Sequence, residues 1–387
     1  MIYLDNPATT WPKPPQVKEA MIRFMDDIGA NPGRSGHRLS IEAARILYET
    51  RESLATLFYV RDPLRIIFTL NATEALNLAL KGLLKPGAHV ITSSMEHNSV
   101  MRPLRDLEKN GIELTIIPCS DVGILDPRDV ERKIRPGTKM VVLNHASNVT
   151  GTLLPIKEVG LIARKHDLLF LVDAAQTAGA YPIHTEQEGI DLLAFTGHKS
   201  LYGPQGTGGL VIGERVNEKE MVPLKQGGTG SRSEFEEQPD FLPDRFESGT
   251  PNGLGLTGLL AGVQFVLEQG VDHIRQEESR LTKQLMEGLE KIPGLKLYGF
   301  ESKLERIATL SFSLSGIVSS DVAMRLEKEF DILCRAGLHC APSAHRTIGT
   351  FPEGTVRFGL SVFNTDEEME AVIQAVSRIS KERRPSL

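Results

Sequence analysis

The stretch Leu169-Phe170-Leu171-Val172-Asp173-Ala174-Ala175-Gln176 decides the fold that we expect. Its apolar half predicts a buried strand, and Asp173 stands where that strand ends. A carboxylate at this point of an open α/β sheet faces the edge where such sheets bind ligands, or else it caps a helix. We therefore expect an α/β fold with a ligand site beside Asp173.

Similar apolar runs recur on both sides of this stretch, separated by helix-length segments. Together they predict seven strands near residues 66–70, 89–92, 114–117, 140–143, 168–172, 192–195 and 209–212. Several of these runs are apolar on both faces, which is typical of strands covered by helices on each side. We expect a wound α/β domain whose seven-stranded sheet is mostly parallel.

The chain changes character after the last of these strands. Residues 214–253 are rich in glycine, proline and acidic residues, a composition typical of functional loops. Two long helical patterns and two further strands follow, and the chain ends in a helix from Asp366. We predict a large domain at residues 15–253 and a smaller α+β domain built from residues 1–14 and 254–387.

Composition excludes several classes of protein. A chain of 387 residues, 40% hydrophobic and 24% charged, can bury the cores of about two globular domains. Its net charge of −6 gives no basic excess for nucleic acid. No apolar run reaches the roughly 18 residues of a membrane helix, and no signal-peptide pattern opens the chain, so we expect a cytoplasmic protein without a nucleic-acid or membrane partner. The three cysteines lack zinc or disulfide spacing, and we expect no metal.

A second polar motif, Thr196-Gly197-His198-Lys199, follows the next predicted strand. A lone lysine in a loop is usually a surface charge, but one strand-to-strand excursion separates Lys199 from Asp173, so both can reach the same sheet edge. The helix start Asn71-Ala72-Thr73 offers backbone amides and a hydroxyl suited to phosphate, or simply a helix cap. An amine, an acid and a phosphate cradle together form the constellation that binds pyridoxal 5′-phosphate (PLP).

Further motifs extend this constellation over nearly the whole chain. In order they are Asn71–Asn77, Glu96-His97-Asn98, Ser147–Gly151, Asp173–Gln176, Thr196–Lys199 and Phe246–Asn252, between Tyr3-Leu4-Asp5-Asn6 and Asn364-Thr365. In this order they resemble the class V aminotransferases of the PLP-dependent transferase fold (fold type I). Within that fold the chain is most similar to the cysteine desulfurases with a short cysteine loop, a group that includes selenocysteine lyases.

The resemblance implies a role for each matching residue of the cofactor site. Lys199 would form a Schiff base with PLP and move the substrate's Cα proton, Asp173 would pair with the pyridine nitrogen, and His97 would stack on the ring. Gln176 would contact the ring hydroxyl. The phosphate would be held by Ala72, Thr73, Thr196 and His198 and, from the partner subunit of a homodimer, by Thr250.

Cys340 matches the desulfurase nucleophile, which receives the substrate's sulfur as a persulfide. A glycine-flanked loop and the nearby His339, Arg335 and His345 would favour its thiolate. The other two cysteines lie in apolar runs that are typical of buried strands.

Arg357 matches the position of the family's arginine for the substrate carboxylate. An arginine suits this role because its guanidinium can bind a carboxylate with two hydrogen bonds. A strand-edge salt bridge is the alternative reading of this residue. Asn148 and Arg335 would add weaker substrate contacts.

We expect a PLP-dependent cysteine desulfurase that converts L-cysteine to L-alanine, with a persulfide on Cys340 for transfer to a protein sulfur acceptor. Leu338 departs from the family pattern, which usually has two histidines before the cysteine. The alternative is a class V aminotransferase or a selenocysteine lyase, acting on L-selenocysteine, that uses the same PLP site without needing Cys340. A PLP-holding or sulfur-relay protein without enzyme activity is a further alternative, disfavoured by the complete Lys199, Asp173 and Arg357 set.

One glycine motif points elsewhere. The run Gly253-Leu254-Gly255-Leu256-Thr257-Gly258 fits the dinucleotide-binding pattern, but it follows Pro251-Asn252 instead of a strand. We therefore expect no nucleotide site there.

Overall fold

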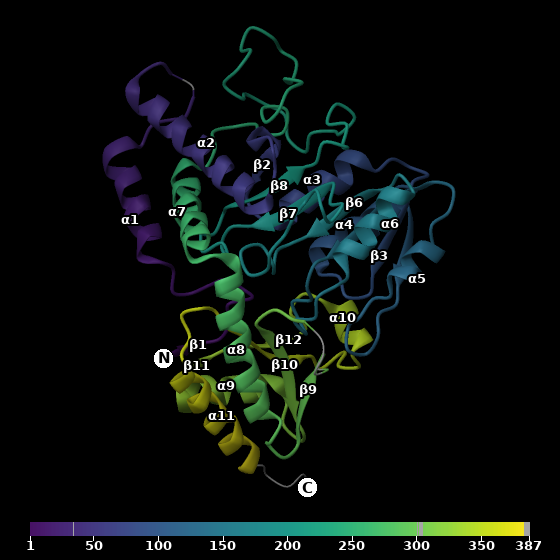
Figure 1. Ribbon diagram of the computed structural model, residues 1–387, viewed down its shortest axis with the longest axis vertical. Helices are drawn as coiled ribbons and strands as arrows, with labels where there is room; N and C mark the ends of the chain where they lie inside the picture. The colour runs from purple at the N-terminus through teal and green to yellow at the C-terminus, as the bar shows by residue number, and fades with distance from the viewer. Residues whose placement is uncertain (34, 300, 302–304, 383–387) are drawn as a thin grey trace.

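A seven-stranded sheet forms the centre of the larger part of the molecule (Figure 1). The computed structural model describes residues 1–33, 35–299, 301 and 305–382. In order across the sheet the strands are β2 (Ile66–Thr69), β8 (Gly208–Ile212), β7 (Leu192–Thr196), β6 (Leu169–Asp173), β5 (Thr138–Asn144), β3 (His89–Ser93) and β4 (Glu113–Ile117). The run from β7 to β4 is parallel, whereas β8 is antiparallel to both of its neighbours. The predicted seven-stranded, mostly parallel sheet is confirmed.

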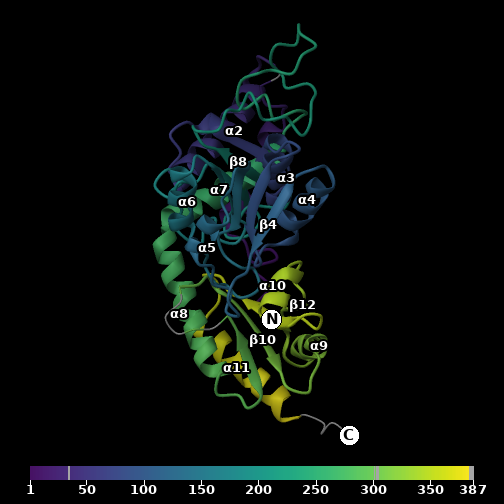
Figure 2. The same ribbon diagram turned by 90° about the vertical axis from the view of Figure 1, so that its right-hand side faces the viewer.

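Successive residues of a strand point to opposite faces, and here both faces are covered. Along β6, Phe170 and Val172 enter one hydrophobic core and Leu171 enters the other. The helices of this part are α1 (Pro15–Arg23), the π-helical turn Phe24–Ile28, α2 (Arg38–Phe58), the 3₁₀ turn Pro63–Arg65, α3 (Ala72–Leu83), α4 (Asn98–Lys109), α5 (Pro127–Arg132), α6 (Ile156–Lys165) and α7 (Gly253–Gln269). Residues 214–252 contain no helix or strand and form the long loops at one end of the molecule in Figures 1 and 2, as the composition predicts.

The smaller part holds a four-stranded antiparallel sheet. Its order is β12 (Arg335–Gly337), β13 (Thr355–Gly359), β10 (Thr309–Leu314) and β9 (Leu295–Tyr298), with helices α8 (Val271–Leu289), α9 (Ser319–Phe330), α10 (Pro342–Thr347) and α11 (Asp366–Lys381). The N-terminal strand β1 (Ile2–Tyr3) pairs in parallel with β11 (Ile332–Leu333) and so belongs to this part. The predicted α+β pattern of the smaller part is thereby confirmed.

The two parts meet at Gly270, where the chain has a φ of +80°. Helix α7 packs on α1 and α2 of the larger part, whereas α8 packs on α11 of the smaller part. The change of neighbours therefore falls between these helices, and the division at residue 253 stays a prediction. Among the described residues no single helix is long and apolar enough to cross a membrane; α7 and α8, bent by 80°, pass that test only as a pair.

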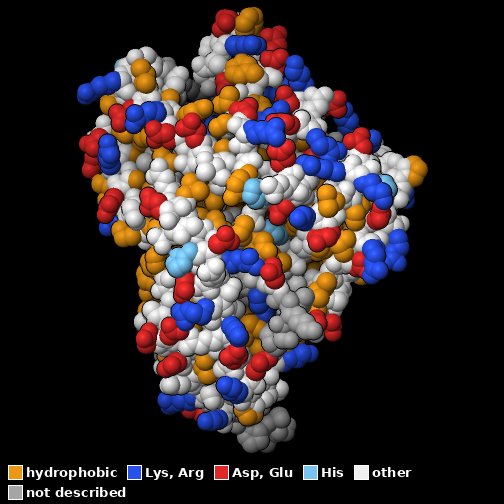
Figure 3. All heavy atoms as spheres, in the orientation of Figure 1, with side chains coloured by type: hydrophobic (Ala, Val, Ile, Leu, Met, Phe, Trp, Pro, Cys, Tyr) orange, Lys and Arg blue, Asp and Glu red, His pale blue; other side chains and the backbone are white. Residues whose placement is uncertain are grey.

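Acidic and basic side chains alternate over the visible face of the molecule, without a large area of one sign (Figure 3).

Candidate active site

A pocket opens at the carboxyl ends of the parallel strands, where Asp173 ends β6 and Thr196 ends β7. It encloses about 520 Å³, part of it open to solvent. Its walls are Asn71, Ala72, Thr73, His97, Ser99, Asn144, Ala146, Asn148, Asp173, Ala175, Gln176, Thr196, His198 and Lys199. The structure thus brings together the residues that the sequence assigns to the cofactor, with the exception of Thr250.

Lys199 and Asp173 influence each other's charge inside this pocket. Burial lowers the pKa of Lys199 to about 8, and the Asp173 carboxylate opposes that shift. Burial also raises the pKa of Asp173, against the hydrogen bond that its Oδ1 accepts from the Ala175 amide at 2.9 Å and the charge of Lys199. The site therefore holds a reactive amine beside an acid with unused hydrogen-bonding capacity.

The helix α3 begins at one end of the pocket, and Asn71 caps it by accepting from the Glu74 amide at 3.0 Å, as predicted. From there the hydroxyls of Thr73 and Ser99 lie 2.8 Å apart, and Ser99 continues to His97 Nδ1 at 2.9 Å. Burial and the charge of Lys199 lower the pKa of His97 to about 3, so its ring is neutral. An uncharged ring is suited to stacking.

Four buried polar atoms of residues that line the same pocket lack a hydrogen-bond partner in the described part of the chain. They are Thr196 Oγ1, His198 Nδ1, Asn144 Oδ1 and Asn148 Oδ1. Because buried polar atoms are nearly always hydrogen-bonded, these atoms indicate a polar ligand.

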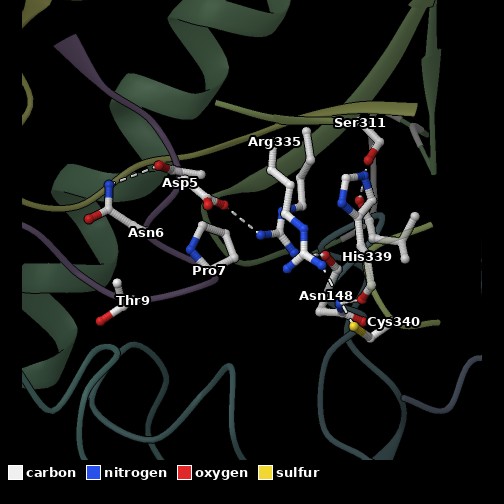
Figure 4. Close-up of polar contacts among 12 residues, drawn as sticks. Asp5, Asn6, Pro7, Thr9, Asn148, Ser311, Arg335, His339 and Cys340 are labelled. Atoms are coloured by element: carbon white, nitrogen blue, oxygen red, sulfur yellow. Dashed lines mark hydrogen bonds and ion pairs between the residues drawn. The ribbon is translucent and has the colours of Figure 1, made fainter. Parts of the chain in front are cut away.

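Cys340 is exposed and lies beside the pocket, although its neighbours His339 and Ala341 are buried. Its carbonyl accepts from the Asn98 amide at 2.8 Å, and the neighbouring His339 carbonyl accepts from Asn148 Nδ2 at 2.7 Å. His97, which precedes Asn98, and Asn148 both line the pocket, so these bonds fix the loop to its rim. The guanidinium of Arg335 reaches the thiol, with Nη2 at 3.6 Å from Sγ (Figure 4).

The loop has an uncommon backbone. His339 and Cys340 have φ angles of +48° and +57°, in the left-handed region that side-chain-bearing residues rarely adopt. Such strain concentrates at functional sites.

The expected contribution of two histidines to the thiolate is wrong. His339 and His345 are buried, and burial lowers their pKa values to about 2 and about 4, so both rings are neutral. Of the three groups that the sequence suggested, Arg335 remains as the cation that contacts Sγ. The other two thiols are poor nucleophiles, because burial raises the pKa of Cys119 to about 11 and of Cys334 to about 12.

Arg357 lies on β13 with only 1% of its surface exposed. Its Nη2 donates to Asp5 Oδ1 at 2.7 Å, and its Nη1 donates to the Asn148 carbonyl at 3.1 Å. The salt bridge that the sequence left open as an alternative is therefore present, and its partner is Asp5. The carboxylate role of Arg357 stays a prediction.

Thr250 lies outside the pocket on its own chain. It is exposed, accepts from Asn31 Nδ2 at 3.4 Å, and lines a separate open cleft together with residues such as Tyr48 and Arg51. The expected phosphate contact from a partner subunit stays a prediction.

Sequence reasoning gave no role to three residues that this geometry makes important. Ser99 joins Thr73 to His97, Asp5 binds Arg357, and the buried carboxyl of Glu96 accepts from Ser93 Oγ at 2.5 Å and from the Asn144 amide at 2.9 Å. Burial raises the pKa of Glu96 to about 8. Each of them lies within or next to one of the motifs named above, and this proximity is the feature of the sequence that could have pointed to their roles.

Comparisons with known proteins agree with this geometry. The family model "Aminotransferase class-V" matches residues 2–372. The chain is similar to proteins named "Probable cysteine desulfurase" from Pyrococcus abyssi, with 35% identity over 100% of this chain and 96% of that protein, and from Methanothermobacter thermautotrophicus, with 33% identity over 98% and 94%.

Solved structures give the same result. A cysteine desulfurase from Thermococcus onnurineus NA1, described as an apo structure, superposes with a TM-score of 0.90 and 36% identity, over 98% of this chain and 94% of that one. The cysteine desulfurase CsdA from Escherichia coli gives 0.87 and 28%, over 99% and 95%. The chain belongs to the class V aminotransferase family and, within it, to the cysteine desulfurases.

Proposed function

We propose that this protein is a PLP-dependent cysteine desulfurase that converts L-cysteine to L-alanine and leaves the sulfur as a persulfide on Cys340. One observation carries the proposal: an exposed thiol in contact with Arg335 is tied by hydrogen bonds to the rim of the Lys199–Asp173 pocket. The overall change is balanced, because cysteine and the enzyme thiol give alanine and the enzyme persulfide.

The residues of the pocket fit PLP. Lys199 supplies an amine for its aldehyde, Asp173 supplies an acceptor for its ring nitrogen, and Thr196 Oγ1 and His198 Nδ1 have unused hydrogen-bonding capacity for its phosphate, beside the start of α3. When bound, PLP supplies an electron sink that weakens the bonds around the substrate's Cα.

The chain's own groups supply the remaining steps. Arg357 binds the substrate's carboxylate, with Asn148 and Arg335 beside it. Lys199 moves a proton at Cα, and burial keeps a useful fraction of its amine neutral near pH 8. Cys340 Sγ accepts the sulfur, and the Arg335 guanidinium stabilises negative charge on it.

We also propose a homodimer, a protein sulfur acceptor and a cytoplasmic location. A second copy would bring Thr250 to a pocket that Thr250 does not reach in its own chain. An acceptor would collect the persulfide from the exposed Cys340. Three free cysteines suit a reducing compartment.

The test is the paired quantification of alanine and sulfide from L-cysteine with a reductant. We expect equal amounts from the wild type and from the control Cys119→Ser, and a loss of more than about a hundredfold in Cys340→Ser. Full activity in Cys340→Ser would overturn the persulfide route. Activity of that variant on L-selenocysteine, or transfer of the amino group to a 2-oxo acid, would instead favour the selenocysteine lyase or aminotransferase alternatives.

A further inference from the structure

The guanidinium of Arg357 already has an anionic partner. Asp5 Oδ1 lies 2.7 Å from Arg357 Nη2, although the two residues are 352 positions apart in the chain. The Arg357 side chain is 1% exposed and that of Asp5 is 24% exposed. Figure 4 shows Asp5 on one side of Arg335, with Asn148 and Cys340 on the other.

The backbone around Asp5 is held from several directions. The Gly359 amide donates to the Leu4 carbonyl at 2.8 Å, and Asn6 Nδ2 donates to the Gly359 carbonyl at 2.9 Å. A Cβ on Gly359 would lie 2.0 Å from Cδ of Pro7, so only glycine lets the N-terminal segment lie this close to β13. The position of Asp5 is thus built into the fold, unlike that of an exposed surface ion pair.

The ion pair leaves Arg357 only partly free for a substrate. Asp5 accepts from one of the two N–H groups of Nη2 and the Asn148 carbonyl from one of the two N–H groups of Nη1, while the buried Nε has no partner among the described residues. A carboxylate gripped by two hydrogen bonds needs two N–H groups of one edge. It therefore has to share the guanidinium with Asp5 or displace it.

Charge leads to the same conclusion. Arg357 and Arg335 both depress the pKa values of His97 and Lys199, which shows that their fields reach the pocket, and Asp5 acts on Lys199 in the opposite direction. Without Asp5 the two guanidiniums would attract a carboxylate more strongly, and they would also retain the carboxylate of the product.

We propose that Asp5 is a positioning residue that orients Arg357 in the free site and, by competing with the incoming α-carboxylate, sets the affinity for the amino acid. The proposal rests on the proposed function only for the identity of that carboxylate. The Asp5 side chain acts through Arg357 and does not itself react.

The test compares the holoenzyme with Asp5→Asn and Asp5→Ala. The probes are L-alanine and ethylamine, which differ only by the carboxylate, and their binding is followed through the absorbance of the bound cofactor and by calorimetry. Asp5→Asn keeps the size and an acceptor oxygen but removes the charge. We expect its Kd for L-alanine to fall about threefold to tenfold, with ethylamine unchanged within about twofold. Asp5→Ala also loses the orienting acceptor, and its Kd for L-alanine should exceed that of Asp5→Asn by at least about threefold.

Turnover provides a readout that a purely structural role would not move. With L-cysteine, Asp5→Asn should lower KM without raising kcat, because the product shares the carboxylate. Unchanged or weaker L-alanine binding in Asp5→Asn overturns the proposal, and so does an equal change for ethylamine. Asp5→Asn decides the test alone if Asp5→Ala does not fold. Should the wild type bind L-alanine yet release no sulfide from L-cysteine, the proposed function fails while the binding comparison still decides the role of Asp5.

Discussion

Lys199 lies where ligands can reach it, and its pKa is lowered; a lysine in a loop usually has neither property. It follows a strand at an edge of the sheet that ligands can reach, and burial among the pocket walls lowers its pKa to about 8. Asp173 limits that shift, since its negative charge stabilises the ammonium form. The balance between burial and one carboxylate decides how much neutral amine is present at a given pH.

This balance predicts how the protein without cofactor takes up PLP. The pKa of Lys199 is about 8, so at lower pH the neutral fraction of its amine grows about tenfold per pH unit. The rate of Schiff base formation should therefore rise from pH 6 and level off above pH 8. Stopped-flow absorbance measures this rate. In Asp173→Asn the inflection should move to lower pH, because the group that raises the pKa is gone. A rate that keeps rising to pH 10 would show an ordinary lysine.

At this scale the sequence is informative where residues lie in short motifs at strand ends, as Asp173 and Lys199 do. It is uninformative where the partner is remote. Nothing near Arg357 in the sequence points to Asp5, and nothing near His339 indicates that its ring turns toward Thr355, with Nε2 at 3.1 Å from the Thr355 carbonyl. Such pairings depend on how β13 packs against the N-terminal segment and against the loop that carries Cys340.

Helix α7 supports the lysine loop at the element scale. A Cβ on Gly262 would lie 2.3 Å from the Leu201 carbonyl oxygen, and one on Gly203 would lie 2.9 Å from a methyl carbon of Leu259. The helix can therefore approach the turn after Lys199 only because these positions carry no side chain. The glycines at 255 and 258, which imitate a dinucleotide motif, lie on the same helix and are packed against Asn252 and Met21.

Gly262→Ala should therefore destabilise the protein and disturb the site together. We expect a loss of about 1–3 kcal/mol in the free energy of unfolding and weaker retention of PLP. Urea unfolding and dialysis of the holoenzyme measure the two effects. The matched control is Gly36→Ala, where no heavy atom lies within 4 Å of the new Cβ. Equal stability of both variants would contradict the close approach of α7.

The elements themselves were largely predictable. The seven strands of the large sheet fall where the apolar runs lie, and the last helix, α11, starts at Asp366 as predicted. The transition between α7 and α8 was harder to locate. Gly270 separates two helical patterns that follow each other directly in the sequence. Only the packing of α7 on α1 and α2 shows that α7 belongs to the larger part and α8 to the smaller part.

The whole molecule depends on segments that join its two parts. Residues 5–13 bind Arg357 through Asp5 and also reach the lysine loop, where the His198 carbonyl accepts from Lys13 Nζ at 2.7 Å and from Thr9 Oγ1 at 3.1 Å. The N-terminal segment thus links the expected carboxylate site to the amine. Helix α8 forms a second link, because burial and, after it, the nearby Glu278 of this helix raise the pKa of Tyr202, which follows the lysine loop.

Glu278 makes stability depend on pH. Burial raises its pKa from the usual 4.5 to about 8, so the folded protein holds this proton more tightly than the unfolded chain does. Its contribution to stability is complete below pH 4.5 and is lost as the pH rises to about 8, by up to about 1.4 kcal/mol per pH unit.

Glu278→Gln keeps the shape without the charge, so its urea midpoint should fall less than that of the wild type between pH 5 and 9. The exposed Glu290→Gln is the control and should follow the wild type. Parallel curves of urea midpoint against pH for Glu278→Gln and the wild type would show that the pKa of Glu278 is not raised in the folded protein.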